Sequence, residues 1–483
     1  MVPGGSTTAR ARVCLDRRGD GAVIDRPTAT AAAARLGGWG RLESPPCHVV
    51  RPSSPAEVAA ALGSASEGSV TPRGLGRSYG DASYDDRGVV LDSRGLDRYV
   101  AFDEATGLLR CEAGVSFADI VRTFVPRGWF LGTTPGTQFV TVGGAIAADV
   151  HGKNHHRVGS FGEHVVEFTL LLASGEVVRC ARDENAELFF ATLGGMGLTG
   201  FVVEATIRLR RIDTAYVTVD YRRSLSLDDS LEAFEQGDGS YEHSVAWVDC
   251  LATGKSLGRG VVMRANHATC ADLPAPDAAA PLALPRRRTW AVPCAPPVSP
   301  LRPWTIRLFN EAFYAAHPDR RAVVDIGRFF YPLDAVRGWN LLYGPKGFIQ
   351  YQAFFPRGTS MQGLRELLSC VSAAGVASFL AVMKSCGKAD GGVLSYLEPG
   401  HTLALDIPWH GSEARMRGLC AAFDAVLLRH GGRIYLAKDA LTTAETFRAM
   451  YPRLAEFQRV RKRVDPAGRF SSALGRRLGI VDG

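Results

Sequence analysis

Residues 135–156 read PGTQFVTVGGAIAADVHGKNHH, and this stretch decides the fold. Its Gly-Gly-Ala-Ile-Ala-Ala run has almost no side-chain bulk, so a flat ring or a pyrophosphate can approach the backbone closely. His151, His155 and His156 follow the run. No carboxylate or cysteine stands at a metal-ligand spacing from them, so we expect no metal site here. The stretch predicts one wall of a ligand pocket.

Two further glycine-rich stretches flank it. Residues 73–81 read RGLGRSYGD, which superficially matches a GxGxxG dinucleotide motif. Tyr79 takes the place of the third glycine, and a strand rather than a helix is predicted to follow, so the context is not that of a Rossmann fold. A row of backbone N–H groups in such a turn binds phosphate oxygens, although a simple tight turn would have the same composition. Residues 193–200, LGGMGLTG, taken alone would indicate only a helix terminus.

The surrounding pattern alternates short strands and helices up to about Ile212, where its character changes. A Pro- and Ala-rich segment, 271–303, contains Arg286-Arg287-Arg288 and is predicted to be a mobile loop. The predicted elements are a helix at 54–63, a strand at 88–92, a hairpin of 99–103 with 108–112, a helix at 117–124 capped by Ser116, a hairpin of 168–172 with 176–179, a helix at 185–193, a strand at 200–209, and a strand at 433–437 followed by two helices.

Composition limits the classes of protein. The 483 residues suit two large domains, and a net charge of +7 is modest at this length. No basic run is interleaved with aromatic residues, so nucleic-acid binding is not expected. The ten cysteines are scattered without a CxxC pair, which favours reduced thiols over a zinc site or a disulfide framework. No signal peptide or membrane-spanning segment is evident. We expect a cytoplasmic protein for which contact with the inner membrane surface stays open.

The glycine stretches occur together with four further motifs, GFIQYQ (347–352), AKD (437–439), TTAETF (442–447) and VDP (464–466). Together they resemble the FAD-binding proteins of the vanillyl-alcohol oxidase and p-cresol methylhydroxylase family, from about Gly38 onward and weakly over 271–303. The resemblance implies an α+β fold of two domains. The FAD-binding domain would be split between 39–212 and 429–483, after a partly disordered segment 1–38. A substrate domain built on an antiparallel sheet would occupy 213–428.

The resemblance also implies how FAD is bound. Many relatives attach FAD through a histidine in the first glycine turn, and Arg77 stands at that position here, so non-covalent FAD is expected. The residues expected to line the cofactor are Arg73, Gly74, Leu75, Gly76, Arg77, Ser78, Tyr79, Gly136, Thr137, Val140, Gly143, Gly144, Val202, Tyr435 and Ala437.

The substrate side follows from the same resemblance. The expected substrate-binding residues are Lys153, Trp247, Gln350, Gln352, Ala404 and Lys438. Lys438 is the expected catalytic cation near the flavin, where it would stabilise the charge of the reduced ring. Tyr79 and His151 are both candidates to deprotonate the reacting hydroxyl. Gln350 and Gln352 alternate with Tyr351, so on a strand both amides face one side.

One departure concerns the substrate. The enzymes that this chain resembles most carry a cysteine beside the flavin, in the stretch that here reads PGHTLALD (399–406), and the corresponding residue is Ala404. Hydride transfer needs no thiol, so we predict oxidation of a secondary alcohol on a sugar to a ketone. A prenyl-phospho-sugar is the first candidate substrate, with an NADH-dependent reductase acting on the product. An aminoglycoside or nucleoside of specialised metabolism is the alternative, and a non-catalytic FAD-binding protein is a third.

Overall fold

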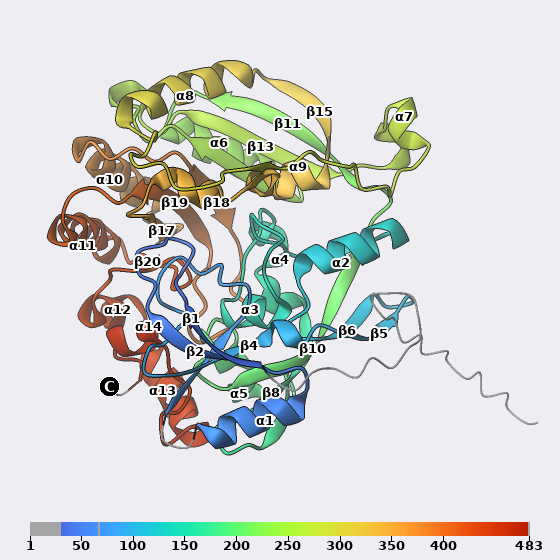
Figure 1. Cartoon of the computed structure of the whole chain (residues 1–483). Helices are drawn as coiled ribbons and strands as arrows, with labels where there is room; N and C mark the ends of the chain where they lie inside the picture. Colours follow the sequence, from blue (N-terminus) through green and yellow to red (C-terminus); the bar gives the residue numbers. More distant parts are fainter. Residues whose placement is uncertain (1–29, 66–67, 482–483) are drawn as a thin grey trace, which may run out of the picture.

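The computed structural model of the protein describes residues 30–65 and 68–481 (Figure 1). Helices and mainly antiparallel sheets make up these residues, which confirms the α+β class. The expected disorder of residues 1–38 falls largely outside the described residues. Residues 30–35 of that segment form a strand, β1, which pairs with β2.

The first sheet lies nearest the start of the described chain. In spatial order it consists of β1 (Thr30–Arg35), β2 (Pro46–Arg51), β4 (Gly88–Asp92) and β3 (Ser69–Arg73). Helix α1 (Pro55–Ser64) starts at Ser54, whose hydroxyl accepts from the Glu57 N–H at 3.3 Å. Val58 and Leu62 of α1 are buried with Val70 of β3, so the helix closes one side of this sheet.

The second sheet is antiparallel throughout and contains both predicted hairpins. Its strands, in spatial order, are β5 (Tyr99–Asp103), β6 (Leu108–Glu112), β10 (Phe201–Arg211), β8 (Val165–Leu171) and β9 (Val177–Ala181), with β7 (Trp129–Leu131) also paired to β10. The helices of this part are α2 (Phe117–Phe124), α3 (Val142–Ala147), α4 (His155–Val158) and α5 (Ala186–Thr192). Ser116 caps α2 as predicted, accepting from the Asp119 N–H at 3.1 Å.

The third sheet has eight strands and forms the upper part of the molecule in Figure 1. Its order is β15 (Arg320–Asp325), β11 (Tyr216–Ser224), β13 (Gly260–His267), β12 (His243–Val248), β18 (Ala381–Cys386), β19 (Gly400–Pro408), β17 (Phe348–Pro356) and β20 (Arg433–Ile434). Helices pack on its outer face, namely α6 (Leu227–Gly237), α10 (Ser360–Ala373) and α11 (Glu413–Arg429). Because side chains alternate along a strand, the other face is left for the interior of the molecule.

The chain returns to the first sheet after β20. Three helices follow, α12 (Ala444–Met450), α13 (Leu454–Val464) and α14 (Ala473–Arg477), where two were expected. The Val70 N–H donates to the Arg469 carbonyl at 2.7 Å, and the Ser471 N–H donates to the Val70 carbonyl at 3.0 Å. These bonds join residues 469–471 to the edge of β3.

Two sequence predictions need correction or refinement. The strand predicted at 433–437 ends at Ile434, because the carbonyl of Tyr435 accepts from the Lys438 and Asp439 N–H groups and turns the chain. The segment 271–303 contains a short helix, α7 (Ala275–Ala278), and β14 (Trp290–Ala291), which pairs with β16 (Val336–Arg337). Its mobility remains a prediction. Helices α8 (Pro303–Ala316) and α9 (Ile326–Phe330) complete this part.

Within residues 30–65 and 68–481, no helix has both the length and the apolarity needed to cross a bilayer.

Candidate functional site

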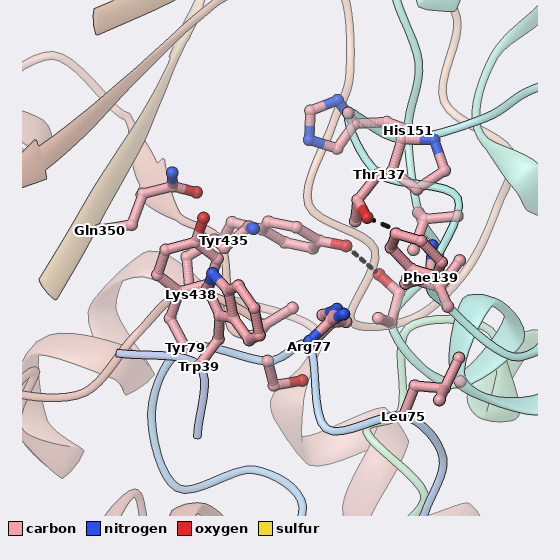
Figure 2. A pocket seen from close by; sticks show the side chains of 18 of the residues that line it. Trp39, Leu75, Arg77, Tyr79, Thr137, Phe139, His151, Gln350, Tyr435 and Lys438 are labelled. Atoms are coloured by element: carbon pink, nitrogen blue, oxygen red, sulfur yellow. Dashed lines mark hydrogen bonds between the residues drawn. The ribbon is translucent and has the colours of Figure 1, made fainter. Parts of the chain in front are cut away.

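A cavity of about 750 Å³ lies between the glycine-rich stretches and the inner face of the eight-stranded sheet. Every residue predicted from the sequence to contact cofactor or substrate lines it. Figure 2 shows Gln350, Tyr79 and Lys438 on one side of the view and Leu75 and Phe139 on the other. We call the turn 73–81 with residues 135–148 the glycine wall. The cavity-facing residues of β12, β18, β19 and β17 are the sheet wall.

The first turn of the glycine wall is packed too closely for side chains. A Cβ on Gly74 would overlap the hydroxyl of Thr141, the residue that caps α3 by accepting from the Gly144 N–H at 3.1 Å. Gly76 has φ +62°, a conformation that L side chains rarely adopt. The Arg73 guanidinium folds beneath the turn and donates to the Gly37 and Ser83 carbonyls at 3.0 Å each. Arg73 thus shapes the turn through its side chain.

The second turn of the glycine wall, around Thr137 and Gln138, is held by a residue of the region predicted to bind substrate. Asp334 accepts from the Thr137 hydroxyl at 2.7 Å and from the Gln138 N–H at 2.9 Å. Arg77 lies 3.9 Å from the ring centroid of Trp39, and burial lowers its pKa. Gly143 lies against Ala113, where an added Cβ would come within 2.9 Å of the alanine methyl. The wall therefore keeps its backbone free of side chains at Gly74, Gly76 and Gly143.

Lys438 and Tyr79 meet where the glycine wall joins the tail of the chain. The Lys438 Nζ lies 3.8 Å from the centroid of the Tyr79 ring. The Tyr79 N–H donates to the Ala437 carbonyl at 2.9 Å, which sets the ring beside the lysine. Burial lowers the pKa of Lys438 to about 7, and the charge of Asp406 opposes that shift. Burial and the charge of Asp406 raise the pKa of Tyr79, so its phenol stays protonated.

A partly buried arginine connects the two segments that carry Tyr79 and Lys438. Arg477 of α14 donates to Asp81 at 2.7 and 2.8 Å, to Asp439 at 2.9 Å and to the Thr442 carbonyl at 2.7 Å. Burial alone would lower the pKa of Arg477, but the two carboxylates hold it above its usual value. This Asp81–Arg477–Asp439 clamp fixes the end of the first glycine turn against the turn that presents Lys438.

The sheet wall contains a row of directly paired residues. Trp247 of β12 pairs with Val382 of β18, Val382 with Ala404 of β19, and Ala404 with Gln352 of β17. All four line the cavity, while Tyr351, the neighbour of Gln352, points to Phe423 and Asp424 of α11. The predicted common face of the two glutamines is thus observed, and Ala404 lies between Val382 and Gln352.

Hydrogen bonds hold the two glutamines and His151 in place. The Gln352 Nε2 lies 2.9 Å from the His151 Nε2, and Gln350 donates to Asp406, the residue paired with it on β19. Burial lowers the pKa of His151 well below its usual value, with Lys384 adding to the effect, so the ring is neutral. Among the described residues the buried Nδ1 of His151 has no hydrogen-bond partner. Such an orphaned nitrogen suits a ligand hydroxyl.

Tyr435 closes the cavity beside His151. Its hydroxyl donates to the Ala148 carbonyl at 2.7 Å, and the rings of Tyr435 and His151 meet edge to face at 5.3 Å. Asp149, at φ +41°, is buried and accepts from the hydroxyls of Ser160 and Ser395 at 2.8 and 2.7 Å. The backbone just before His151 is therefore held from both sides.

The cavity contains more cationic and polar groups than the sequence reasoning had found. Lys384 of β18 and Thr402 of β19, a directly opposed pair, both line it. Burial lowers the pKa of Lys384 to about 8 and that of Lys153 to about 7. Lys153 donates to the Phe329 carbonyl. The polar pair Lys384-Ser385 within the strand AVMKSC (381–386) was the available signal for Lys384, but it does not indicate which sheet face is enclosed.

One group of described residues outside the cavity lining has metal-ligand chemistry. Single ligand atoms of Glu242, His243 and His267 lie within 4.8 Å of one another. Arg210 binds both oxygens of Glu242 at 3.1 Å, which places a positive charge beside the group. That charge opposes a cation, and we assign no metal there. The other two histidines of the sequence cluster contact backbone groups instead. His155 accepts from the Gly387 N–H at 3.1 Å, and His156 contacts the Tyr241 carbonyl at 3.0 Å.

The cavity residues fit a flavin nucleotide. The glycine wall leaves its backbone uncovered at Gly74 and Gly143, where an added Cβ would overlap Thr141 or crowd Ala113. Tyr435 and Ala437 meet this wall from the tail, and Lys438 provides a cation at the same place. A flat ring that gains negative charge when reduced requires this combination of a bulk-free surface and a fixed cation.

Comparison with known proteins agrees with this fit. Residues 46–181 match the family model described as FAD binding domain, and residues 354–478 match D-arabinono-1,4-lactone oxidase. A decaprenylphosphoryl-β-D-ribose oxidase from Mycolicibacterium smegmatis is 37% identical over 461 residues, covering 94% of this chain and 99% of that protein. The chain belongs to the decaprenylphosphoryl-β-D-ribose oxidase family. It is an FAD-dependent oxidoreductase of the FAD-linked oxidase group, as the sequence predicted.

Other relatives place this family among wider groups. An uncharacterized Streptomyces coelicolor protein, named for its position in the mprA 5′ region, is 37% identical over 366 residues, or 74% of this chain and 97% of that protein. Cytokinin dehydrogenase 7 of rice, Oryza sativa subsp. japonica, is 28% identical over 45% of each chain. This chain thus shares part of its length with dehydrogenases whose name indicates another substrate.

Proposed function

We propose that this protein oxidises a secondary hydroxyl of a prenyl-phospho-sugar to a ketone, most like the 2′-oxidation of decaprenylphosphoryl-β-D-ribose. The observation that carries the proposal is the enclosure of Lys438, Tyr79, His151 and two hydrogen-bonding glutamines in one cavity with a bulk-free wall. The similarity to a ribose oxidase along nearly the whole chain supports it. The aminoglycoside or nucleoside alternative gains no support from the relatives.

The residues would divide the reaction between binding and charge control. The secondary alcohol loses a hydride from its carbon and a proton from its oxygen to become a ketone, and bound FAD supplies the hydride acceptor. Gln350 and Gln352 would hold sugar hydroxyls, since both present amides from β17 to the cavity. Lys438 would stabilise the negative charge that the flavin gains when it accepts the hydride. Lys153 and Lys384 would add positive potential for the substrate phosphate.

The proton of the reacting hydroxyl needs a partner on the protein. We propose the neutral ring of His151, whose orphaned Nδ1 can exchange a proton with the substrate oxygen while Gln352 holds the Nε2 side. Tyr79 is the other candidate. Its pKa is raised, so it would act as a hydrogen-bond donor rather than as a phenolate base.

Non-covalent FAD is part of the proposal. Arg77 stands at the turn position where relatives carry a linking histidine, and its guanidinium stacks on Trp39. An arginine has no nucleophilic nitrogen at neutral pH because it remains protonated. Acid or heat precipitation should release all of the flavin into the supernatant. Flavin that stays with the precipitated protein would refute this.

The test of the proposed function is anaerobic bleaching of the bound flavin. A panel should pair prenyl-phospho-sugars with soluble glycosides, including aminoglycosides and nucleosides, and follow flavin absorbance in a single turnover. We expect bleaching with a prenyl-phospho-ribose and none with the soluble panel. Bleaching by a soluble glycoside alone would replace the proposed substrate class, and a preparation that binds no FAD would refute the enzyme itself.

The finer partner and domain assignments are proposals as well. We propose that an NADH-dependent reductase consumes the ketone, which would complete a 2′-epimerisation. We also propose that the protein works in the cytoplasm at the inner face of the membrane, where a prenyl-linked substrate resides. The domain division at about 212 is supported by the strand grouping, because the eight-stranded sheet takes its first strand from residue 216. The sheet extends past the proposed boundary at 429, since β20 (Arg433–Ile434) belongs to it.

A further inference from the structure

The cavity is bordered by an exposed apolar edge. Trp304 and Leu308 of α8 are each 67% exposed, and Ala312 and Ala315 continue the same exposed stripe at helical spacing. The opposite side of α8 is buried through Ile306 and Asn310, and Asn310 donates to Asp249 at 2.7 Å. The helix is thus anchored on one side and presents large apolar side chains to solvent on the other. Exposed apolar surface of this kind usually marks a contact site.

The edge is continuous with the opening of the cavity. Phe309 of α8 lines the cavity and is itself 36% exposed. Trp290 of β14 is 73% exposed and pairs with Val336, another cavity-lining residue. Trp290 and Trp304 are therefore both exposed, and each lies on an element (β14 or α8) that adjoins the same cavity. We call Trp290, Trp304, Leu308 and Phe309 the apolar lip.

The sequence segment that carries the lip is rich in positive charge. Between Asp277 and Glu311 the sequence contains no Asp or Glu and five arginines. These are Arg286, Arg287, Arg288, Arg302 and Arg307. Arg287 binds Asp325, and the other four are exposed. Glu311, the acid of α8, is paired with Arg259.

We propose that the apolar lip and its arginines are a docking surface for an anionic lipid bilayer. Tryptophan side chains favour the membrane–water interface, and arginines near it are attracted to anionic headgroups. A second protein would also cover apolar groups, but an acid-free segment with five arginines matches a uniformly negative surface better. Docked in this way, the cavity would open toward the layer that holds a prenyl chain. This last point depends on the proposed function, whereas lipid binding itself does not.

The test is co-sedimentation of the full-length, FAD-loaded protein with vesicles. We expect binding to phosphatidylcholine vesicles that contain phosphatidylglycerol, weaker binding to phosphatidylcholine alone, and a loss of binding at high salt. The double variant Trp304→Ser with Leu308→Ser should weaken binding about tenfold or more, because both side chains lose their apolar burial. Its matched control is Val177→Ser with Leu428→Ser, which changes exposed apolar residues on β9 and α11 and should bind like wild type.

A second pair of variants tests the charge. Arg302→Gln with Arg307→Gln should reduce binding to the anionic vesicles and flatten its salt dependence, while Arg459→Gln with Lys462→Gln on α13 should not. Wild-type levels of binding by either lip variant would overturn the proposal. So would a change of oligomeric state, seen by light scattering without lipid, in the Trp304 and Leu308 variant, because a second copy would then be the occupant.

A separate measurement distinguishes this inference from the proposed function. A water-soluble prenyl-phospho-sugar with a short chain should reduce the flavin equally fast in wild type and in the Trp304→Ser, Leu308→Ser variant. Reduction without vesicle binding would leave the enzyme function standing and remove the docking surface. Vesicle binding without flavin reduction by any prenyl-phospho-sugar would leave the docking surface standing and refute the proposed enzyme function.

Discussion

The glycine wall and the sheet wall enclose the same cavity but are built differently. Gly74 and Gly143 contribute backbone and leave space, and charged side chains such as Arg73 lie behind the surface. Gln352 and Lys384 contribute side chains that project from strands into the cavity. A backbone surface can be altered by adding a single carbon atom, whereas a side-chain surface can be exchanged residue by residue. The glycine wall therefore suits a ligand that stays the same among related proteins, and the sheet wall suits a ligand that differs between them.

The largest effect is expected where the two walls meet, at Lys438. Lys438→Met should keep FAD bound, because the glycine wall is unchanged. The rate of anaerobic flavin reduction by substrate should fall by about a hundredfold or more, since a fixed electrostatic donor contributes roughly 3–4 kcal/mol to such a step. Stopped-flow single turnovers measure this without reoxidation. Lys255→Met, at an exposed position of the short 3-10 helix Gly254–Ser256, is the control. A Lys438→Met protein that binds FAD and is reduced at the wild-type rate would remove Lys438 from the reacting centre.

A change confined to the glycine wall should act on FAD affinity instead. In Gly74→Val the new side chain would displace Thr141, which caps α3. We expect the FAD dissociation constant to rise by about five- to a hundredfold, the range that corresponds to 1–3 kcal/mol of overpacking. Fluorescence titration of the apoprotein is the measurement. Gly358→Val, where an added Cβ has no neighbour within 4 Å, is the control. Equal FAD affinity in the two variants would contradict the close fit assigned to this wall.

The pH dependence of reduction tests the charge of Lys438. With a pKa of about 7, its ammonium group is present below that pH and lost above it. The reduction rate should therefore fall as pH rises through about 7, by up to about tenfold per pH unit. Lys438→Arg keeps the positive charge throughout, because the guanidinium pKa exceeds about 12, and the fall should disappear. Anaerobic single turnovers from about pH 6 to about pH 9 would show it. A wild-type profile flat over this range would count against the assignment.

The smallest change concerns one methyl group of the sheet wall. Nitroarenes that are reduced at the flavin and then trap a neighbouring thiol should form no stable adduct on β19, because Ala404 has no nucleophile. Ala404→Cys puts a thiol between Val382 and Gln352 and should form the adduct. Peptide mass mapping detects it. An adduct on β19 of the unchanged protein would show that this strand had been aligned incorrectly.

The two walls also differ in how far the sequence predicts them. Gly74 and Gly76 lie in a local turn and the 143–148 run lies in the short helix α3 and its C-cap, so their role follows from a short stretch of sequence. Lys384 and Thr402 meet only because β18 pairs with β19, and the row from Trp247 to Gln352 depends on a strand order that is not the order of the chain. No local pattern contains that information.

The tail shows a similar limit. Residues 433–437 have the composition of a strand, but the Tyr435 carbonyl accepts two N–H groups from the following turn and ends β20 at Ile434. That turn packs on Tyr79 and Gly80, residues more than three hundred positions earlier in the chain. Tertiary packing here overrides local propensity. The motif containing Lys438 was recognised, whereas its backbone shape was not.

The Asp81–Arg477–Asp439 clamp has a consequence for biosynthesis. Arg477 and Asp81 are 396 positions apart, so the first glycine turn lacks this partner until α14 has been translated. Contacts of such large sequence separation slow folding. A ribosome-bound chain that ends before α14 would hold Asp81 and Asp439 without their shared cation. We therefore expect a nascent chain that lacks α14 to hold FAD more weakly than one in which α14 has been made.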